Sequence, residues 1–259
     1  MEGKLHAMYF SPTRTTQRVI AALTPVIGEG LGLAREDIDL TRPAAREKAY
    51  AFGKEDLLIF GFPVYAGRIP TLLESLFPKL SGSETPAVVI ATYGNRDYDD
   101  ALLEAKDLLT ARGFVVIAAG AFIGEHSFSN ILAAGRPDRD DLDIAATFAG
   151  KIVEKRRGGS PAAVSVKGNF PYRDGMAAMP FLPKTKEACT KCLACVKGCP
   201  MGVIDPADPA QVSPGCILCC ACVKICPVGA KYFDAEPLAK MRARLEGNFM
   251  ARKEPELFL

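Results

Sequence analysis

The hydrophobic positions of the first 157 residues alternate between short, continuous apolar runs and longer segments with helical spacing. Four such runs predict strands, at residues 4–10, 57–61, 87–91 and 114–121. Continuous apolar character is typical of parallel strands that are buried on both faces of a sheet. Residues 34–40 predict a fifth strand at a sheet edge, because four of their seven side chains are charged.

Segments with helical spacing lie between these strands. They predict helices from about Thr13 onward and at about residues 70–78, 98–112 and 138–157. Strands that alternate with helices indicate an α/β fold, a doubly wound, five-stranded parallel sheet in the order 2-1-3-4-5. The sequence Gly28-x-Gly30-x-Gly32 precedes a predicted strand instead of following one, so we interpret it as a turn and not as a nicotinamide site.

The pattern changes after residue 157. Residues 158–186 are rich in Gly and Pro, which predicts a linker or an extended strap between two domains. All nine cysteines of the chain follow, within the segment 187–236. Residues 237–259 predict a closing helix and a tail, with apolar side chains at Leu238, Met241, Leu245 and Phe249.

The cysteine segment is an internal repeat. CTKCLACVKGCP begins at Cys189 and CILCCACVKICP begins 27 residues later, at Cys216. Three cysteines that are each separated by two other residues suit one 4Fe–4S cluster, and the fourth, before a proline, ligates the other cluster. The predicted ligands of one cluster are Cys189, Cys192, Cys195 and Cys226. Those of the other are Cys216, Cys219, Cys222 and Cys199.

Structural zinc is the alternative for these cysteines. Zinc sites favour paired C-x2-C sequences that are separated by a longer loop, whereas this chain has two tandem four-cysteine sequences with the proline. Iron–sulfur clusters are therefore the favoured prediction. Cys220 lies off the ligand spacing, and we predict it to be a small buried side chain.

Composition and charge narrow the class of protein. Hydrophobic residues make up 49% and charged residues 24% of the chain, which predicts an ordinary folded protein. No apolar run approaches the roughly 20 residues of a membrane span, and the N-terminus does not resemble a signal peptide, so we expect a cytoplasmic protein. Residues 158–259 carry 13 Lys and Arg against 9 Asp and Glu. Two anionic clusters offset that excess, so no nucleic-acid partner is predicted.

A hydroxyl-rich loop follows the first predicted strand, at the mouth of the first helix. Its candidate residues are Ser11, Thr13, Arg14, Thr15 and Thr16. Hydroxyls and backbone N–H groups at a helix N-terminus bind phosphate, although a simple helix cap has the same composition. The loop lies where doubly wound sheets bind ligands, beyond the carboxyl end of strand 1, which favours the phosphate site.

Two more loops are predicted at the same rim, at residues 61–68 and 93–98. Their Gly, Pro and Tyr residues allow close backbone approach and supply flat aromatic faces, which suit a planar ring. The candidate ring-binding residues are Pro63, Val64, Tyr65, Ala66, Gly67, Tyr93, Gly94, Asn95 and Tyr98. His126 follows the fifth strand, and both a place beside the ring and an ordinary surface or core position stay open for it.

These motifs carry a resemblance to known families. The N-terminal part resembles the flavodoxins, whose phosphate loop reads S/T-x-T-G-x-T, and the C-terminal part resembles bacterial two-cluster ferredoxins. Together, with YFSPTRTT and PVYAGRIP, they resemble the fused flavodoxin–ferredoxin proteins of anaerobes. The resemblance implies a flavodoxin-like fold, FMN and two 4Fe–4S clusters. Two departures stand out: Arg14 takes the place of the family's Gly, and the chain has no Trp.

The predicted function is electron transfer between FMN and the two clusters, which couples two-electron flavin chemistry to one-electron carriers. Redox proteins are the expected partners, and the sequence leaves the oligomeric state open, a homo-oligomer included. One alternative is a flavin-dependent reductase of a small molecule such as a quinone. Another is an FMN-free scaffold that delivers a ferredoxin domain. We also expect the strap to dock the two domains together through its apolar residues, which are Phe170, Pro171, Tyr172, Met176, Met179, Phe181 and Leu182.

Overall fold

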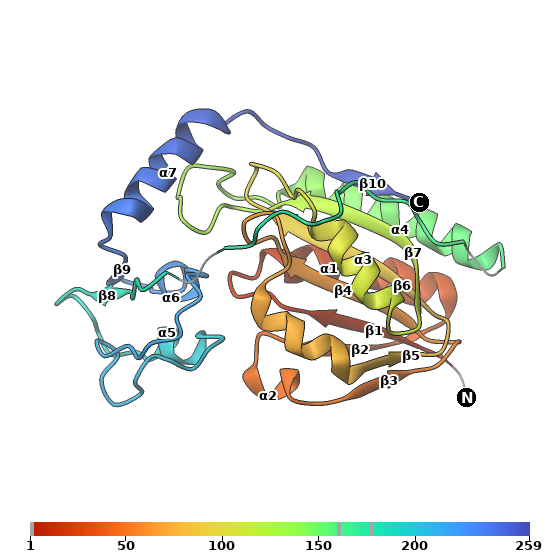
Figure 1. The fold of residues 1–259 in the computed structure, drawn as a ribbon, viewed down its shortest axis with the longest axis horizontal. Helices are drawn as coiled ribbons and strands as arrows, with labels where there is room; N and C mark the ends of the chain where they lie inside the picture. The colour runs from red at the N-terminus through yellow and green to blue at the C-terminus, as the bar shows by residue number, and fades with distance from the viewer. Residues whose placement is uncertain (1–2, 160–161, 177–178) are drawn as a thin grey trace.

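The structure is a computed structural model, and it describes residues 3–159, 162–176 and 179–259. A parallel sheet lies at the centre of the first part of the chain (Figure 1). Its parallel strands are β1 (Lys4–Tyr9), β2 (Ala34–Asp39), β4 (Leu57–Pro63), β6 (Thr85–Tyr93) and β7 (Phe114–Ile123). They lie in the order β2-β1-β4-β6-β7, which confirms the predicted 2-1-3-4-5 order and the flavodoxin-like fold.

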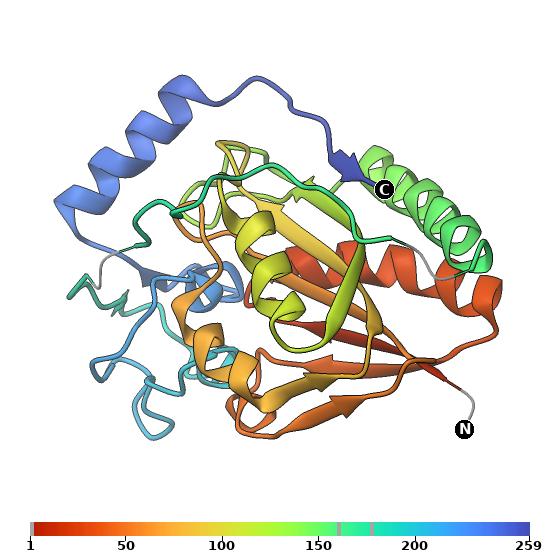
Figure 2. The ribbon, with the colours of Figure 1, turned by 45° about the vertical axis from the view of Figure 1, so that its right-hand side comes forward.

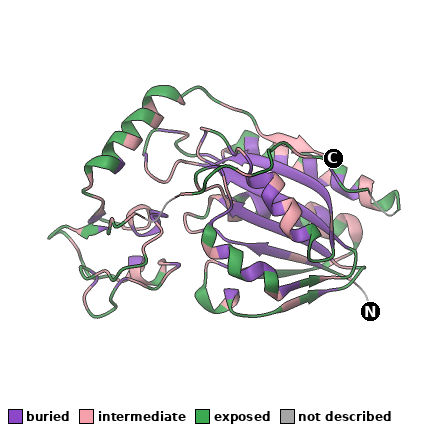
Figure 3. Ribbon diagram, in the orientation of Figure 1, coloured by how far each residue is buried: buried purple, intermediate pink, exposed green. Residues whose placement is uncertain are grey.

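The burial of each strand follows its position in this sheet. Every residue of β6 is buried, and β4 is buried except at its last residue, because helices cover both faces of these central strands (Figure 3). The first four residues of β2 are exposed, in agreement with the predicted charged edge strand. The continuous apolar runs of the sequence thus mark the middle of the sheet.

Helices cover the two faces of the sheet. One face packs against α1 (Thr15–Leu31) and α4 (Arg139–Arg157), and the other against the 3-10 helix η1 (Thr71–Lys79) and α3 (Ala101–Thr110) (Figures 1 and 2). All four were predicted as helices, with ends that differ by a few residues. Apolar side chains fill the space on both faces and form the core.

The glycines at 28–32 correct one expectation. Gly28 and Gly30 belong to helix α1, and only Gly32, with a φ of 67°, forms its left-handed end. A Cβ atom added to Gly30 would lie 2.7 Å from a methyl group of Val153 in α4. Gly30 therefore allows α1 and α4 to pack closely, and the turn that we predicted is shorter than expected.

Three short elements of this part were not predicted. They are α2 (Pro43–Arg46), β3 (Tyr50–Phe52) and β5 (Leu80–Gly82), and β3 pairs with β5 in a small parallel sheet beside the main one.

The sequence repeat of the cysteine segment is also a backbone repeat. Its elements are β8 (Lys184–Thr185), α5 (Ala194–Lys197), α6 (Ala221–Lys224) and β9 (Lys231–Tyr232). The two helices are 27 residues apart, and so are the left-handed residues that precede them, Leu193 with φ 60° and Cys220 with φ 58°. Two equivalent loops therefore bring two equivalent sets of cysteines into position.

The C-terminal residues return to the main sheet. Helix α7 (Glu236–Asn248) is followed by β10 (Glu256–Phe258), which pairs antiparallel with β7 as a sixth strand (Figure 2). The sequence predicted the helix but not this strand. The side-chain amide of Asn95 donates to the carbonyl oxygens of Phe249 and Ala251, at 2.6 and 2.8 Å, and holds the tail in place.

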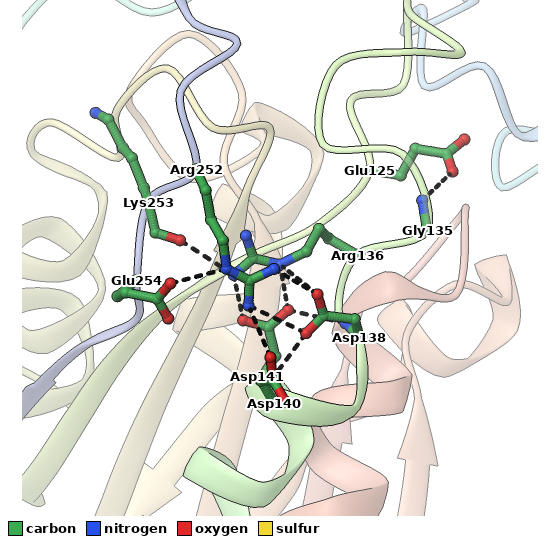
Figure 4. A network of polar contacts seen from close by, with 9 residues as sticks. All are labelled: Glu125, Gly135, Arg136, Asp138, Asp140, Asp141, Arg252, Lys253 and Glu254. Atoms are coloured by element: carbon green, nitrogen blue, oxygen red, sulfur yellow. Dashed lines mark hydrogen bonds and ion pairs between the residues drawn. The ribbon is translucent and has the colours of Figure 1, made fainter.

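A group of charged side chains fastens the same tail to the start of α4 (Figure 4). The guanidinium of Arg252 donates to a carboxylate oxygen of Asp138 at 2.5 Å. The guanidinium of Arg136 donates to the backbone oxygen of Lys253 at 3.1 Å and pairs with the buried carboxylate of Asp141. The C-terminal tail is therefore held against the main sheet and the start of α4.

Apolar packing and polar bonds together hold the described part of the strap. Val164 is buried in the core on one face of the main sheet, and Val166 packs against that core. Carboxylate oxygens of Asp100 accept from the backbone N–H groups of Asn169 and Arg173, at 2.8 and 2.7 Å. The hydroxyl of Tyr172 donates to Asp107 at 2.8 Å. Phe170 is 78% exposed, so the expectation that it packs in an apolar contact is wrong. Within the described residues, no helix is both long and apolar enough to span a membrane.

Candidate functional site

The eight predicted cluster ligands line two separate cavities of the cysteine segment. Cavity I is bordered by Cys189, Cys192, Cys195 and Cys226. Cavity II is bordered by Cys199, Cys216, Cys219 and Cys222. Each cavity joins three cysteines of one repeat to the fourth cysteine of the other, which is the crossed arrangement that the spacing suggested. Cys220 is buried and also borders cavity II, at the position that Leu193 takes beside cavity I.

The surroundings of these sulfur atoms suit thiolate ligands of an iron–sulfur cluster. Backbone N–H groups point at several of them, such as that of Ala230, which lies 3.1 Å from Cys226 Sγ. Burial raises the pKa of Cys219 and of Cys222 to about 12, so a thiolate at either position needs a cation such as iron beside it. Among the described residues, no three His, Cys, Asp or Glu side chains are placed to hold a single metal ion.

The hydroxyl-rich loop borders a small cavity at the rim of the parallel sheet, which we call the small rim cavity. Thr13 and Thr15 line it, at the N-terminus of the 17-residue helix α1. No acidic side chain stands in the first turn of α1, so the positive end of the helix dipole is free to act on an anion. The other predicted site residues that line this cavity are Pro63, Val64, Tyr65, Tyr93, Gly94 and His126.

Three residues of that loop have other surroundings. The buried hydroxyl of Ser11 accepts from the backbone N–H of Gln17 at 3.0 Å and so shapes the loop. The buried hydroxyl of Thr16 lies 2.6 Å from that of Thr92, inside the fold. Arg14 is exposed and has a φ of 65°, a left-handed conformation that glycine would adopt without strain.

A larger cavity of about 410 Å³ adjoins the small one, and we call it the large rim cavity. This volume is within the usual range for a pocket that binds a cofactor or small molecule. The residues that line it on the side of the sheet are Val64, Tyr65, Ala66, Gly67, Tyr93, Gly94 and His126. The backbone at Ala66 and Gly67 is left-handed, with φ values of 51° and 83°. The loop after β4 therefore turns sharply and exposes its main chain to the cavity.

Asn95 and Tyr98 do not line either rim cavity. The Asn95 amide binds the C-terminal tail, and the hydroxyl of Tyr98 donates to Glu256 at 2.9 Å. Both side chains are almost completely buried. In this structure they support the loop that carries Tyr93 and Gly94.

Burial controls the protonation of two side chains that line the rim cavities, those of Tyr65 and His126. Burial, and next the neighbouring Cys219, raise the pKa of Tyr65 well above its ordinary value, so its hydroxyl keeps its proton. Burial and the charge of Lys224 lower the pKa of His126 to about 4. The His126 Nδ1 atom accepts from the backbone N–H of Phe128 at 3.1 Å, which leaves the proton of the neutral ring on Nε2.

The opposite wall of the large rim cavity was not predicted. It comes from the second cysteine repeat, through Ile217 and Leu218, from helix α7, through Met241 and Leu245, and from Phe249, which directly follows the helix. Met241 and Leu245 are four residues apart, so they share one face of the helix. That spacing marks an apolar face in the sequence, but it does not tell which surface the face covers.

Cys219 borders both cavity II and the small rim cavity, and so joins the two kinds of site. Polar bonds hold this junction together. The Lys224 ammonium donates to Glu125, Ser129 and Asn130, which follow β7, at 2.6, 2.6 and 2.9 Å. Arg46 donates to the backbone oxygen of Pro200 at 2.6 Å. The cysteine segment therefore forms one side of the rim cavities.

Comparisons with known proteins found one family match and several similar solved structures. Residues 182–236 match the family described as a 4Fe-4S dicluster domain. No curated protein matches the chain in sequence. Among solved structures, the chain is similar to a flavodoxin from the domain Archaea, with 15% identity and a TM-score of 0.43, over 60% of this chain and 99% of that one. It is also similar to flavodoxin 1 from Bacillus cereus, with 17% identity and a TM-score of 0.41, over 59% and 98% of the two chains.

The strand order and the matched segment together define the class of protein. The chain joins a flavodoxin-like fold to a ferredoxin-type 4Fe–4S segment, a combination that serves electron transfer or other redox chemistry.

Proposed function

We propose that this protein carries electrons between FMN, bound in the two rim cavities, and two 4Fe–4S clusters, bound in cavities I and II. On this proposal residues 1–157 hold the flavin, residues 158–186 are the strap, residues 187–236 hold the clusters, and residues 237–259 close the flavin site. FMN supplies the exchange between two-electron and one-electron transfer. Thr13, Thr15 and the N-terminus of α1 bind its phosphate, and Tyr65, Ala66, Gly67 and Tyr93 border its ring.

The observation that carries the proposal is the shared position of Cys219. This cysteine borders cavity II and, on its other side, the cavity that contains Thr13 and Thr15. Its neighbours Ile217 and Leu218 line the large rim cavity. A cluster in cavity II is thus separated from the flavin site by one wall of side chains, which is the placement that direct electron transfer requires.

The two clusters have different positions on this path. Cavity I shares no lining residue with either rim cavity, and Cys192, which borders cavity I, is exposed. We therefore propose that electrons pass between the flavin and cavity II, and then between cavity II and cavity I. A redox protein partner exchanges electrons at the exposed side of cavity I.

The cofactor content is the first test. Protein that is purified or reconstituted anaerobically should contain about eight iron and eight sulfide per chain, and one FMN. Stoichiometric zinc without sulfide would contradict the proposal for the cysteines. Two clusters without FMN, even after incubation with excess flavin, would favour the FMN-free scaffold instead.

The second test asks whether the cofactors form one path. A one-electron reductant is mixed rapidly with the loaded protein, and the absorbance of the clusters and the flavin is followed in time. Because the sites share a wall, the transfer between them should be independent of protein concentration. A transfer rate that rises in proportion to protein concentration would show that electrons pass between molecules, as in two independent carriers on one chain.

A small-molecule reductase is the second candidate, and one cavity favours it. A cavity of about 220 Å³ lies beside Tyr65 and is bordered by Ile69, Leu72, Met176 and Ile217. Its mainly apolar wall suits a small apolar acceptor such as a quinone. If this candidate is right, Leu72→Trp, which fills the cavity, should abolish benzoquinone reduction by the reduced protein and leave the transfer between clusters and flavin unchanged.

A further inference from the structure

The two halves of the cysteine repeat differ in charge at one matched buried position. The first half reads Cys199-Pro200-x-Gly202-x-Ile204 and the second reads Cys226-Pro227-x-Gly229-x-Lys231. Ile204 borders cavity II and Lys231 borders cavity I, and each residue is only 3% exposed. At this buried position the two sites therefore differ by a lysine, in addition to the difference between Leu193 and Cys220.

The surroundings of Lys231 do not supply a counter-ion of the usual kind. Its ammonium donates to the backbone oxygen of Pro209, which also borders cavity I. Among the described residues, no carboxylate forms an ion pair with this ammonium. A buried ammonium with one neutral acceptor is costly unless a negative charge lies near. The thiolates and sulfides of a cluster in cavity I provide that charge.

We propose that Lys231 raises the reduction potential of the cluster in cavity I above that of the cluster in cavity II. This inference rests on the proposed ligation of two clusters. One-electron reduction adds one negative charge to a cluster, and a buried positive charge beside it stabilises the reduced form. Ile204 offers no such charge to the other cluster. Electrons that arrive from the flavin side consequently collect at cavity I, the cluster with an exposed cysteine.

The experiment is an anaerobic redox titration of the loaded, full-length protein, followed by electron paramagnetic resonance. Lys231→Ile is the main variant, because isoleucine occupies the equivalent buried position of the other half, and Lys231→Met is the second. Lys184→Met is the matched control. Lys184 lies on β8, which pairs with β9, but its side chain is 57% exposed.

The native protein should show two separate reduction steps. In Lys231→Ile and Lys231→Met the upper step should move down by about 59 mV or more, a tenfold loss in the equilibrium constant for reducing that cluster. The lower step should move less, and the control should leave both steps in place.

Four results would overturn the inference. The first is a native protein whose two clusters are reduced at the same potential, and the second is a lysine variant that keeps all its iron and the native separation. The third is an equal displacement in the Lys184→Met control. If both apolar variants lose one cluster, Lys231 serves assembly and not the potential. A native protein with zinc or with one cluster would instead contradict the proposed function itself.

Discussion

Lys224 provides the sharpest test of how the two parts of the chain are joined. Its ammonium donates three hydrogen bonds, to Glu125 Oε1, the Ser129 backbone oxygen and Asn130 Oδ1. Its side chain is only 20% exposed. Lys224→Met keeps the length of the side chain and removes every one of these bonds. The loop after β7 then loses its attachment to the second cysteine repeat.

The size of the effect follows from the chemistry of these bonds. A hydrogen bond to a charged group contributes about 1.5–3 kcal/mol. Three bonds that share one ammonium are not additive, so we expect a loss of about 2 kcal/mol in total. A loss of this size corresponds to a roughly 30-fold increase in the opening equilibrium of the loop.

Hydrogen exchange measures this opening directly. The backbone N–H of Glu125 donates to Arg136 at 2.8 Å, and that of His126 donates to Leu132 at 3.1 Å. Both amides should exchange about 30-fold faster in Lys224→Met, since exchange requires the loop to open. The transfer of electrons between cavity II and the flavin should slow in the same variant, because the shared wall is then held by fewer bonds, among them that of Arg46 to Pro200.

Lys197→Met is the matched control, since Lys197 occupies the equivalent position 27 residues earlier in the first repeat. Lys197 is exposed, and its ammonium makes no such bonds within the described residues. Native exchange rates in Lys224→Met, or the same acceleration in both variants, would refute the conclusion that Lys224 fastens the two parts together.

Three further predictions concern single residues of the rim. Arg14→Gly should make the cofactor-free protein about 1 kcal/mol more stable in denaturant unfolding, because glycine adopts the left-handed conformation without strain; equal stability of Arg14→Gly and Arg14→Ala would contradict this. Since burial lowers the folded-state pKa of His126 to about 4, below the unfolded value of about 6.5, the unfolded state binds the extra proton first. Stability should therefore fall as the pH decreases from 6.5 to 4, His126→Gln should lose this part of the pH dependence, and an imidazole that titrates near pH 6.5 by NMR would disprove the burial argument. Asn95 has a left-handed φ of 64°, so Asn95→Gly removes the bonds to Phe249 and Ala251 without adding strain. It should cost about 2 kcal/mol, seen as faster hydrogen exchange in the C-terminal strand β10; unchanged exchange there would mean that other contacts hold the tail.

Much of this protein is determined by local sequence. The central strands are apolar runs because both of their faces are buried, and that property is visible without any knowledge of their neighbours. The spacing of the cysteines within each repeat depends on one short loop and one helical turn, so the crossed sets could be proposed from the sequence alone. The hydroxyl-rich loop that we propose binds phosphate is equally local, since the pattern requires only hydroxyl side chains and the start of a helix.

The roles of Thr16, Asn95 and Tyr98 needed the tertiary structure. Each has the side chain that a flavin loop uses, but each is bound to a group 76 or more residues away in the sequence, Thr16 to Thr92, for example. A hydroxyl or an amide serves a ligand and a buried neighbour equally well. Which of the two it meets depends on how distant segments pack, and no local pattern records that.

The second wall of the rim cavities was also decided only by the tertiary structure. Helix α7 and strand β10 come from the last residues of the chain. Met241 and Leu245 of α7 nevertheless border the large rim cavity, and β10 pairs with β7 of the main sheet. An apolar helix face shows in the sequence that something must cover it, and a free sheet edge accepts any extended segment through its backbone groups. Long-range packing selects which surface the helix face covers and which strand the extended segment pairs with. Apolar contact and backbone pairing accept many different sequences, so the local sequence does not specify the choice.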